Sequence, residues 1–214
     1  MERRFCGIAL VLLFTIPCPL PGQVKAPSLR DEVRQHGGAW RITYHDDLLL
    51  ATFDQLINQS DFIIRGRVVD EHTRLSPDEK SVLTDYTIEV LEIFKDPGNV
   101  LKIGDKLVVS KWGGNVVAEG KPVRVDTPKF PPIPWVQPHV FFIARWRGAA
   151  PAGEYLFVGS EIGVVPIEHG QIVCNTRERS GHPISKPFCG KTEVEFLQVL
   201  KEKITATNTP QPHP

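Results

Sequence analysis

The side chains that most often perform catalysis or bind metals are scattered along this sequence. No two of the seven histidines are spaced four residues apart, so no helical pair of metal ligands exists. The histidines are His36, His45, His72, His139, His169, His182 and His213. The densest polar cluster, His45-Asp46-Asp47, fits either a metal or acid–base site or a solvated turn, and we favour the turn. His139 precedes an apolar stretch, where we expect a buried or rim histidine rather than a ligand or a base.

The motifs of the common enzyme classes are missing. The sequence has no HExxH zinc motif, no GxSxG nucleophile motif, no GxxxxGK[S/T] or GxGxxG phosphate loop and no calcium loop. The segment Gly159–Gly163 contains a serine, but at the wrong position for a nucleophile elbow. Glu89 and Glu92 are expected on opposite faces of a strand unless a bulge falls between them. We therefore predict no catalytic residue, no metal ligand and no cofactor.

The cysteines divide by position. Cys6 and Cys18 lie in the N-terminal segment, and Cys174 and Cys189 lie 15 positions apart near the C-terminus. We predict a disulfide between Cys174 and Cys189 if the chain is exported, since disulfides persist in oxidising compartments. The alternative is a pair of buried free thiols, and no CxxC or CxxH spacing supports a metal site.

A proline-rich segment is the most distinctive surface candidate. Residues 127–138 hold five prolines, which exclude a central strand. The apolar side chains here either form an exposed patch for a partner or fold back and plug one end of the β domain, and we favour the plug. Trp112, beside Gly113-Gly114, shares this ambiguity. The candidate interaction surface comprises Trp112, Phe130, Ile133 and Trp135.

The N-terminus has the pattern of a cleaved secretory signal. Arg3 and Arg4 precede the apolar run IALVLLFTI at 8–16, and three prolines follow. This run is too short to span a bilayer, so no transmembrane span is expected in the mature chain. A buried N-terminal helix is one alternative. A lipoprotein anchored through Cys18 is another, which Pro17 disfavours because a small residue is expected at that position.

Export bounds the partners. Residues 1–26 hold three of the 25 bases and one of the 25 acids, which leaves the mature chain with a net charge of −2. This balance disfavours a nucleic acid, which needs a basic face. We expect a periplasmic or extracellular protein that binds another protein or a small ligand. The expected organisation is a signal at 1–26, a linker or arm at 27–50, one domain at 51–204 and a disordered tail at 205–214.

The hydrophobic pattern of the domain is mainly β. A capping box at Thr52–Gln55 predicts a short helix ending near Gln59, and an apolar stripe predicts a second helix over Thr192–Ile204. Gly66 within one strand and a phase slip at Leu91–Ile93 within the next indicate β-bulges. We predict a small OB-like barrel, closed or partly closed, with a β-sandwich as the alternative. The strands are expected at 62–73, 82–95, 107–111, 115–118, 122–125, 140–146, 155–158, 163–167 and 171–174, and a short strand or ordered arm at 39–44.

Four segments resemble those of a loose group of uncharacterised exported bacterial proteins. The segments are the strand at Phe62–Val69, the long strand at Thr84–Lys95, Gly113–Gly114 and the buried strand VFFIARW at Val140–Trp146. The resemblance covers about half of the chain and implies an OB-like barrel in the cell envelope. It implies no activity and transfers no functional residue. The proline-rich insert and the cysteine-bounded loop depart from the group.

These observations favour a non-enzymatic binding or interaction module of the cell envelope. An inhibitor of a secreted hydrolase is a second hypothesis, in which the proline-rich segment or the cysteine-bounded loop would insert into the enzyme. A hydrolase with a dispersed catalytic site is a third. Inhibition of a hydrolase panel supports the second, and turnover of ester, peptide or glycan substrates supports the third.

Overall fold

The computed structural model describes residues 28–36, 40–43, 52–126, 132–135, 137–146, 155–174 and 182–208. The predicted signal with Cys18, the cluster His45-Asp46-Asp47 and Phe130 lie outside these residues.

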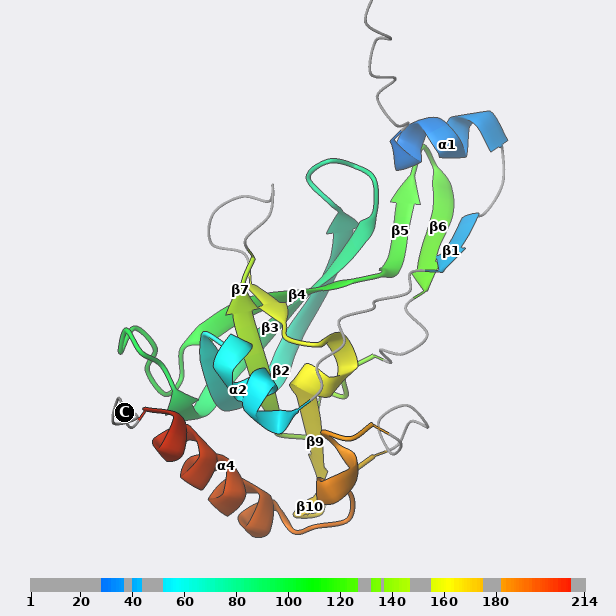
Figure 1. Ribbon diagram of the computed structural model, residues 1–214. Coiled ribbons are helices and arrows are strands. Elements are labelled where there is room, and N and C mark those ends of the chain that lie inside the picture. The colour runs from blue at the N-terminus through cyan, green and yellow to red at the C-terminus, as the bar shows by residue number, and fades with distance from the viewer. Residues whose placement is uncertain are drawn as a thin grey trace, which may run out of the picture.

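A closed five-stranded barrel forms the body of the protein (Figure 1). Its strands pair in the order β2-β3-β4-β8-β7, and β7 pairs back to β2. All of these pairings are antiparallel except the parallel pairing of β4 with β8. This is the OB-type barrel predicted from the sequence rather than the β-sandwich. The strands are β2 (Phe62–Leu75), β3 (Val82–Lys95), β4 (Lys106–Trp112), β7 (His139–Arg145) and β8 (Tyr155–Phe157).

Bulges between β2 and β3 curve this ladder enough to close the barrel. Arg65 pairs with Glu92 and Gly66 pairs with Val90, so Leu91 is the extra residue. The phase slip predicted near Leu91 is therefore confirmed. A Cβ at Gly66 would lie 2.6 Å from Ile88 Cγ2 and 2.7 Å from the carbonyl oxygen of Glu89. The backbones approach so closely here that only glycine fits.

A small sheet and a helix cover the outer end of the β2–β3 hairpin. The sheet pairs β1 (Trp40–Thr43), β6 (Lys121–Asp126) and β5 (Gly114–Ala118) in that order. Helix α1 (Leu29–His36) lies where the sequence suggested a linker. Leu29 and Val33 lie one turn apart and bury against Val82 and its neighbours. The polar composition of 27–38 concealed this two-residue apolar stripe.

Two arginines of α1 tie the helix to two hairpin turns. Arg30 pairs with Glu79 of the β2–β3 turn at 3.0 Å. Arg30 and Arg34 both pair with Glu119 of the β5–β6 turn, at 3.4 and 3.1 Å. These contacts, mainly Arg34, lower the pKa of Glu119 below its ordinary value. The ion pairs are solvent-accessible, so burial of Leu29 and Val33 contributes more to holding the helix.

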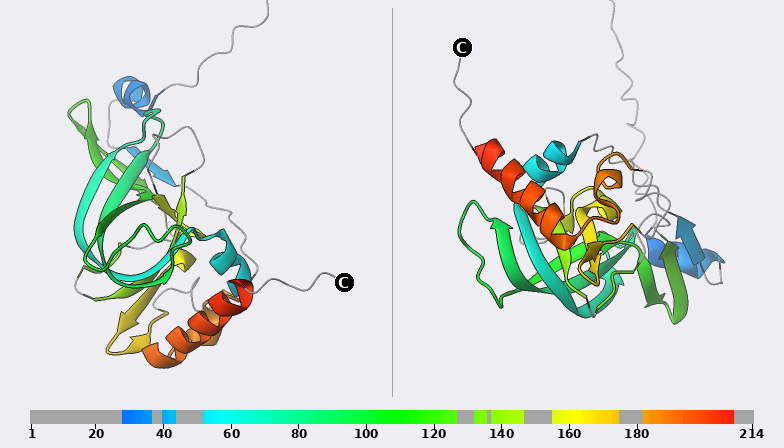
Figure 2. Two further views of the ribbon diagram at one scale, coloured as in Figure 1. Left: turned by 90° about the vertical axis from the view of Figure 1, so that its left-hand side faces the viewer. Right: turned by 90° about the horizontal axis from the view of Figure 1, so that it is seen from below.

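The remaining helices pack on the other side of the barrel, where α2 and α4 lie together (Figure 2, left). The predicted capping box is confirmed, because Thr52 Oγ1 accepts from the Gln55 backbone and the Gln55 side chain accepts from the Thr52 backbone. Helix α4 runs four residues beyond the predicted end at Ile204, into the expected tail. The elements are α2 (Phe53–Gln59), η1 (Ser160–Gly163), β9 (Val164–Glu168), β10 (Gln171–Ile172), η2 (Lys186–Phe188) and α4 (Glu193–Asn208).

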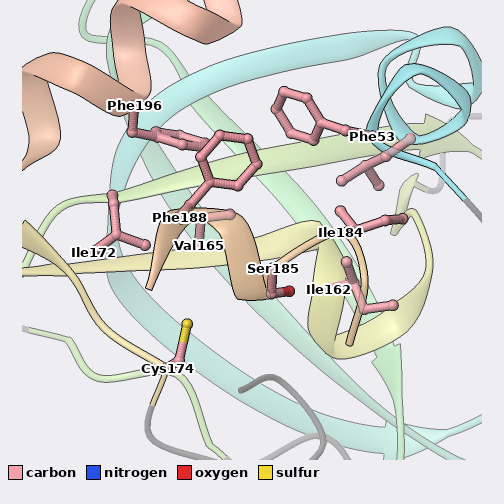
Figure 3. Close-up of a pocket in the computed structure, with 10 residues that line it drawn as sticks. Phe53, Ile162, Val165, Ile172, Cys174, Ile184, Ser185, Phe188 and Phe196 are labelled. Carbon is pink, nitrogen blue, oxygen red and sulfur yellow. The ribbon is translucent and has the colours of Figure 1, made fainter. Parts of the chain in front are cut away.

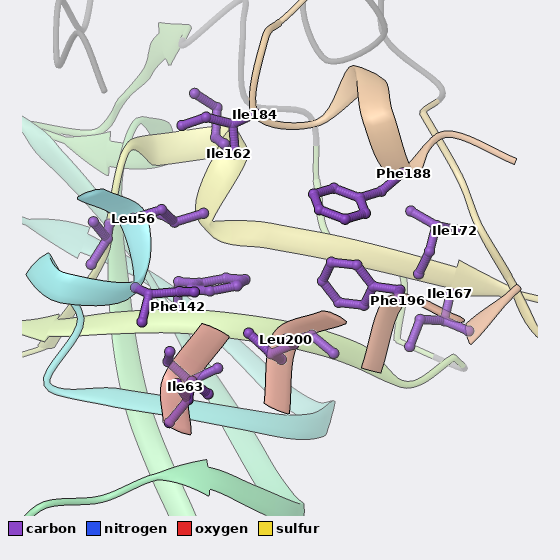
Figure 4. Close-up of a cluster of buried hydrophobic side chains, with 14 residues drawn as sticks. Leu56, Ile63, Phe142, Ile162, Ile167, Ile172, Ile184, Phe188, Phe196 and Leu200 are labelled. Atoms are coloured by element: carbon purple, nitrogen blue, oxygen red, sulfur yellow. The ribbon is translucent and has the colours of Figure 1, made fainter. Parts of the chain in front are cut away.

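One hydrophobic core fills the inside of the barrel. The elements listed above enclose another, the second core, against the outer face of the barrel (Figure 4). Ile63 of β2 and Phe142 of β7 contribute from the barrel, and Leu56, Phe196 and Leu200 contribute from the helices. Each of these five side chains is fully buried. None of the described helices is long and apolar enough to cross a membrane.

The predicted disulfide between Cys174 and Cys189 is present. It joins the segment after β10 to the residue that follows η2, and η2 carries Phe188 of the second core. The bond therefore fixes one side of that core.

Removing the disulfide tests how much this link stabilises the fold. We expect Cys174→Ser combined with Cys189→Ser to lower the free energy of unfolding by about 3 kcal/mol, since the bond no longer restricts a loop of 15 residues in the unfolded chain. Urea unfolding measures the change. The wild type under a reducing agent should match the double variant, and a change within about 0.5 kcal/mol would contradict the prediction.

Candidate interaction site

The structure separates the four residues of the predicted interaction surface. Ile133 is only 3% exposed and lies in the core inside the barrel, as the plug interpretation expects. Trp135, two residues later, is 49% exposed. Trp112 packs against Trp146 with ring centroids 5.1 Å apart. Trp112 therefore lies on the opposite face of β4 from its inward-facing neighbour Lys111, because adjacent strand residues point to opposite faces.

The indole of Trp135 is hydrogen-bonded to a strand of the barrel. Its Nε1–H donates a hydrogen bond to Glu71 Oε2 of β2 at 3.3 Å. Ile133 anchors the same short segment through its buried side chain and through a hydrogen bond between its backbone and the Tyr86 hydroxyl. Trp135 is thus exposed, with its indole N–H bound to Glu71 and its segment anchored at Ile133.

Beneath this segment a lysine and a tyrosine point into the barrel. Lys111 Nζ lies 5.8 Å from the ring centroid of Tyr86, which is nearly fully buried. Burial lowers the pKa of Lys111 to about 8, although the charge of Glu71 opposes this shift. Burial also raises the pKa of Tyr86 well above its ordinary value, so its hydroxyl stays protonated at neutral pH. We call Glu71, Tyr86, Lys111, Ile133 and Trp135 the barrel mouth.

Sequence reasoning missed three members of the barrel mouth: Glu71, Tyr86 and Lys111. Lys111 shares its strand face with the buried residues Leu107 and Val109, so an inward position was readable from the alternation of β4. The position of Glu71 beside Tyr86 could not be predicted from the alternation of β2. The third register shift of the β2–β3 ladder, between Val68 and Asp70, changes the parity of β2 before Glu71, which then pairs with Tyr86.

The other titratable candidates have structural partners. His139 is fully buried, with Nδ1 2.9 Å from the Pro138 carbonyl oxygen and its ring against Phe141, as expected for a buried histidine. Glu89 and Glu92 lie on one face, because the Leu91 bulge falls between them. Each pairs with a different cation, Glu89 with Arg67 at 2.7 Å and Glu92 with Lys201 at 3.0 Å. Within the described ranges, no three His, Cys, Asp or Glu side chains gather closely enough to share a metal ion.

A small apolar cavity lies within the second core (Figure 3). The rings of Phe53, Phe188 and Phe196 line it together with aliphatic side chains, and Cys174 and Ser185 lie at its border. Its volume is about 10 Å³, which is close to the least that admits one water molecule. It is a packing defect of the core rather than a ligand pocket.

Comparison with protein-family models and with curated proteins finds no match to this chain.

Proposed function

We propose that this protein is a non-enzymatic interaction module of the cell envelope, and that it binds a protein partner through the barrel mouth with Trp135 at the centre. The observation that carries the proposal is the exposed indole of Trp135 with its N–H bound to Glu71. A tryptophan combines a large apolar surface with a polar handle, and such residues are enriched among those that contribute most to binding.

The two contacts that position Trp135 support this choice. Free energy of binding is lost whenever a side chain must be ordered on contact, so a residue that is already positioned binds more tightly. Ile133 fixes the backbone by insertion into the barrel core, and Glu71 orients the indole. Among the described residues, the other exposed large apolar side chains are all aliphatic: Val100, Ile103, Val108, Val117 and Val194.

Location in the envelope is part of the same proposal. The Cys174–Cys189 disulfide supports it, since such bonds persist in oxidising compartments and are rare in the cytosol. The signal-like N-terminus supports it independently from the sequence.

Site-specific photo-cross-linking tests the proposal. A benzophenone amino acid at position 135, expressed in the producing cell, should give one discrete cross-linked product in the envelope or secreted fraction. The same amino acid at Val117, an exposed position on β5, serves as the control and should not give that product. The absence of any product specific to position 135 would contradict the proposal.

The identity of the cross-linked product separates the narrower hypotheses. If the product contains a secreted hydrolase that loses activity when the protein binds, the module is an inhibitor. If the product contains a protein without hydrolytic activity, the module serves assembly or recognition.

A further inference from the structure

The turn between β3 and β4, Asp96–Asp105, exposes aliphatic side chains. Ile103 is 72% exposed and Val100 is 56% exposed. Figure 2 (right) shows this green turn projecting from the body of the protein beside α4. An open hollow beside it has a mixed lining, which comprises Ile93, Phe94, Lys95, Asp96, Pro97, Asn99 and Leu101.

The carboxylates and the lysines of the turn differ in their partners. Both carboxylates bind backbone amides of the turn itself: Asp96 accepts from Gly98 and Leu101, and Asp105 accepts from Lys102. Lys102 and Lys106 are exposed and, among the described residues, neither has an ion-pair partner. The turn and the first residue of β4, which lies opposite Glu89, therefore present aliphatic side chains beside two exposed lysines, while the two carboxylates bind the backbone.

From this juxtaposition we infer that the β3–β4 turn binds an anionic lipid surface. Val100 and Ile103 enter the boundary between headgroups and acyl chains, while Lys102 and Lys106 remain at the level of the phosphates. The apolar area is far smaller than the roughly 800 Å² that each partner contributes to a stable protein interface. A bilayer imposes no such minimum, because its surface accepts a few side chains at a time.

This lipid contact is compatible with the proposed partner site and does not depend on it. Along the β2–β3 ladder, the turn follows the pair Ile63–Lys95, whereas the barrel mouth lies at the pair Glu71–Tyr86. Eight positions of β2 separate these pairs, so the protein can touch a membrane while Trp135 faces elsewhere.

Vesicle co-sedimentation of the protein purified from its producing cells tests the inference. Wild type should bind vesicles of phosphatidylcholine and phosphatidylglycerol in equal parts, and bind pure phosphatidylcholine more weakly. Val100→Glu combined with Ile103→Glu should lower the partition coefficient at least about tenfold. Lys102→Gln combined with Lys106→Gln should lower it by about tenfold on anionic vesicles only. Every variant carries the same N-terminus, so any contribution of residues 1–26 cancels.

Val117→Glu is the matched control, since it places the same charge at an exposed valine on another hairpin. Its binding should equal that of wild type, and circular dichroism melts should show that all variants fold. Three results would overturn the inference: wild type that does not bind anionic vesicles, turn variants that bind as wild type does, or Val117→Glu that loses binding equally. Self-association of wild type that the turn variants abolish, without vesicle binding, would also overturn it, in favour of a contact between copies.

Discussion

Replacing Phe196 by alanine is expected to lower the free energy of unfolding by about 3–5 kcal/mol. Phe196 is fully buried at the centre of the second core. Its ring centroid lies 5.1 Å from that of Phe188 and 6.1 Å from that of Phe53. Alanine would leave a cavity between elements that come from both the barrel and the helices. Urea unfolding followed by circular dichroism measures the loss.

Val194→Ala on the same helix is the control, because Val194 is mostly exposed. It should change the free energy of unfolding by no more than about 0.5 kcal/mol. If Phe196→Ala destabilised the protein by less than about 1 kcal/mol, α4 would not pack on the barrel as described.

Lys111 is expected to give the second large effect, as a dependence of stability on pH. Burial lowers its pKa from the ordinary 10.5 to about 8 in the folded protein. Between pH 8 and 10.5 the unfolded chain therefore binds more protons at this residue than the folded chain does. Stability rises with pH in such a window, and the full penalty of the buried charge applies below pH 8. At about 1.4 kcal/mol for each pH unit, the penalty reaches about 3 kcal/mol.

Lys111→Met should therefore be more stable than wild type at pH 7 and lose most of that advantage by pH 10. Methionine keeps the length and apolar packing of the side chain, and Glu71 stays solvated because it is exposed. Tyr86 is present in both proteins, so its own titration cancels in the difference. Lys102→Met at an exposed position should show no pH-dependent difference from wild type. A constant difference between Lys111→Met and wild type from pH 7 to pH 10 would show that the ammonium is not buried.

The features predicted correctly from the sequence are those that short segments specify. Thr52 and Gln55 form a capping box within one turn, so the start of α2 needs no distant partner. Gly66 and the slip near Leu91 mark the bulges because alternation within a single strand reveals them. The strand segments and their turns then favour a closed OB-type barrel, and the structure has one.

The features that were missed depend on distant partners. Helix α1 is stabilised by two buried residues whose contacts, such as Val82, lie about 50 positions away. The barrel mouth depends on the register shift between Val68 and Asp70, which changes the parity of β2 and brings Glu71 beside Tyr86. Ile133 and Trp135 are nearly identical in sequence context, yet one is buried and the other exposed. Only the path of the backbone over the barrel decides between them.

The affinity of the partner cross-linked at position 135 tests the central claim most directly. Isothermal titration should show that Trp135→Ala weakens binding at least about 30-fold, the loss expected for a central aromatic contact. Trp135→Phe should weaken binding less, because phenylalanine keeps an aromatic ring but loses the hydrogen bond to Glu71. Val117→Ala should bind as wild type does. Equal affinity of wild type and Trp135→Ala would contradict the account.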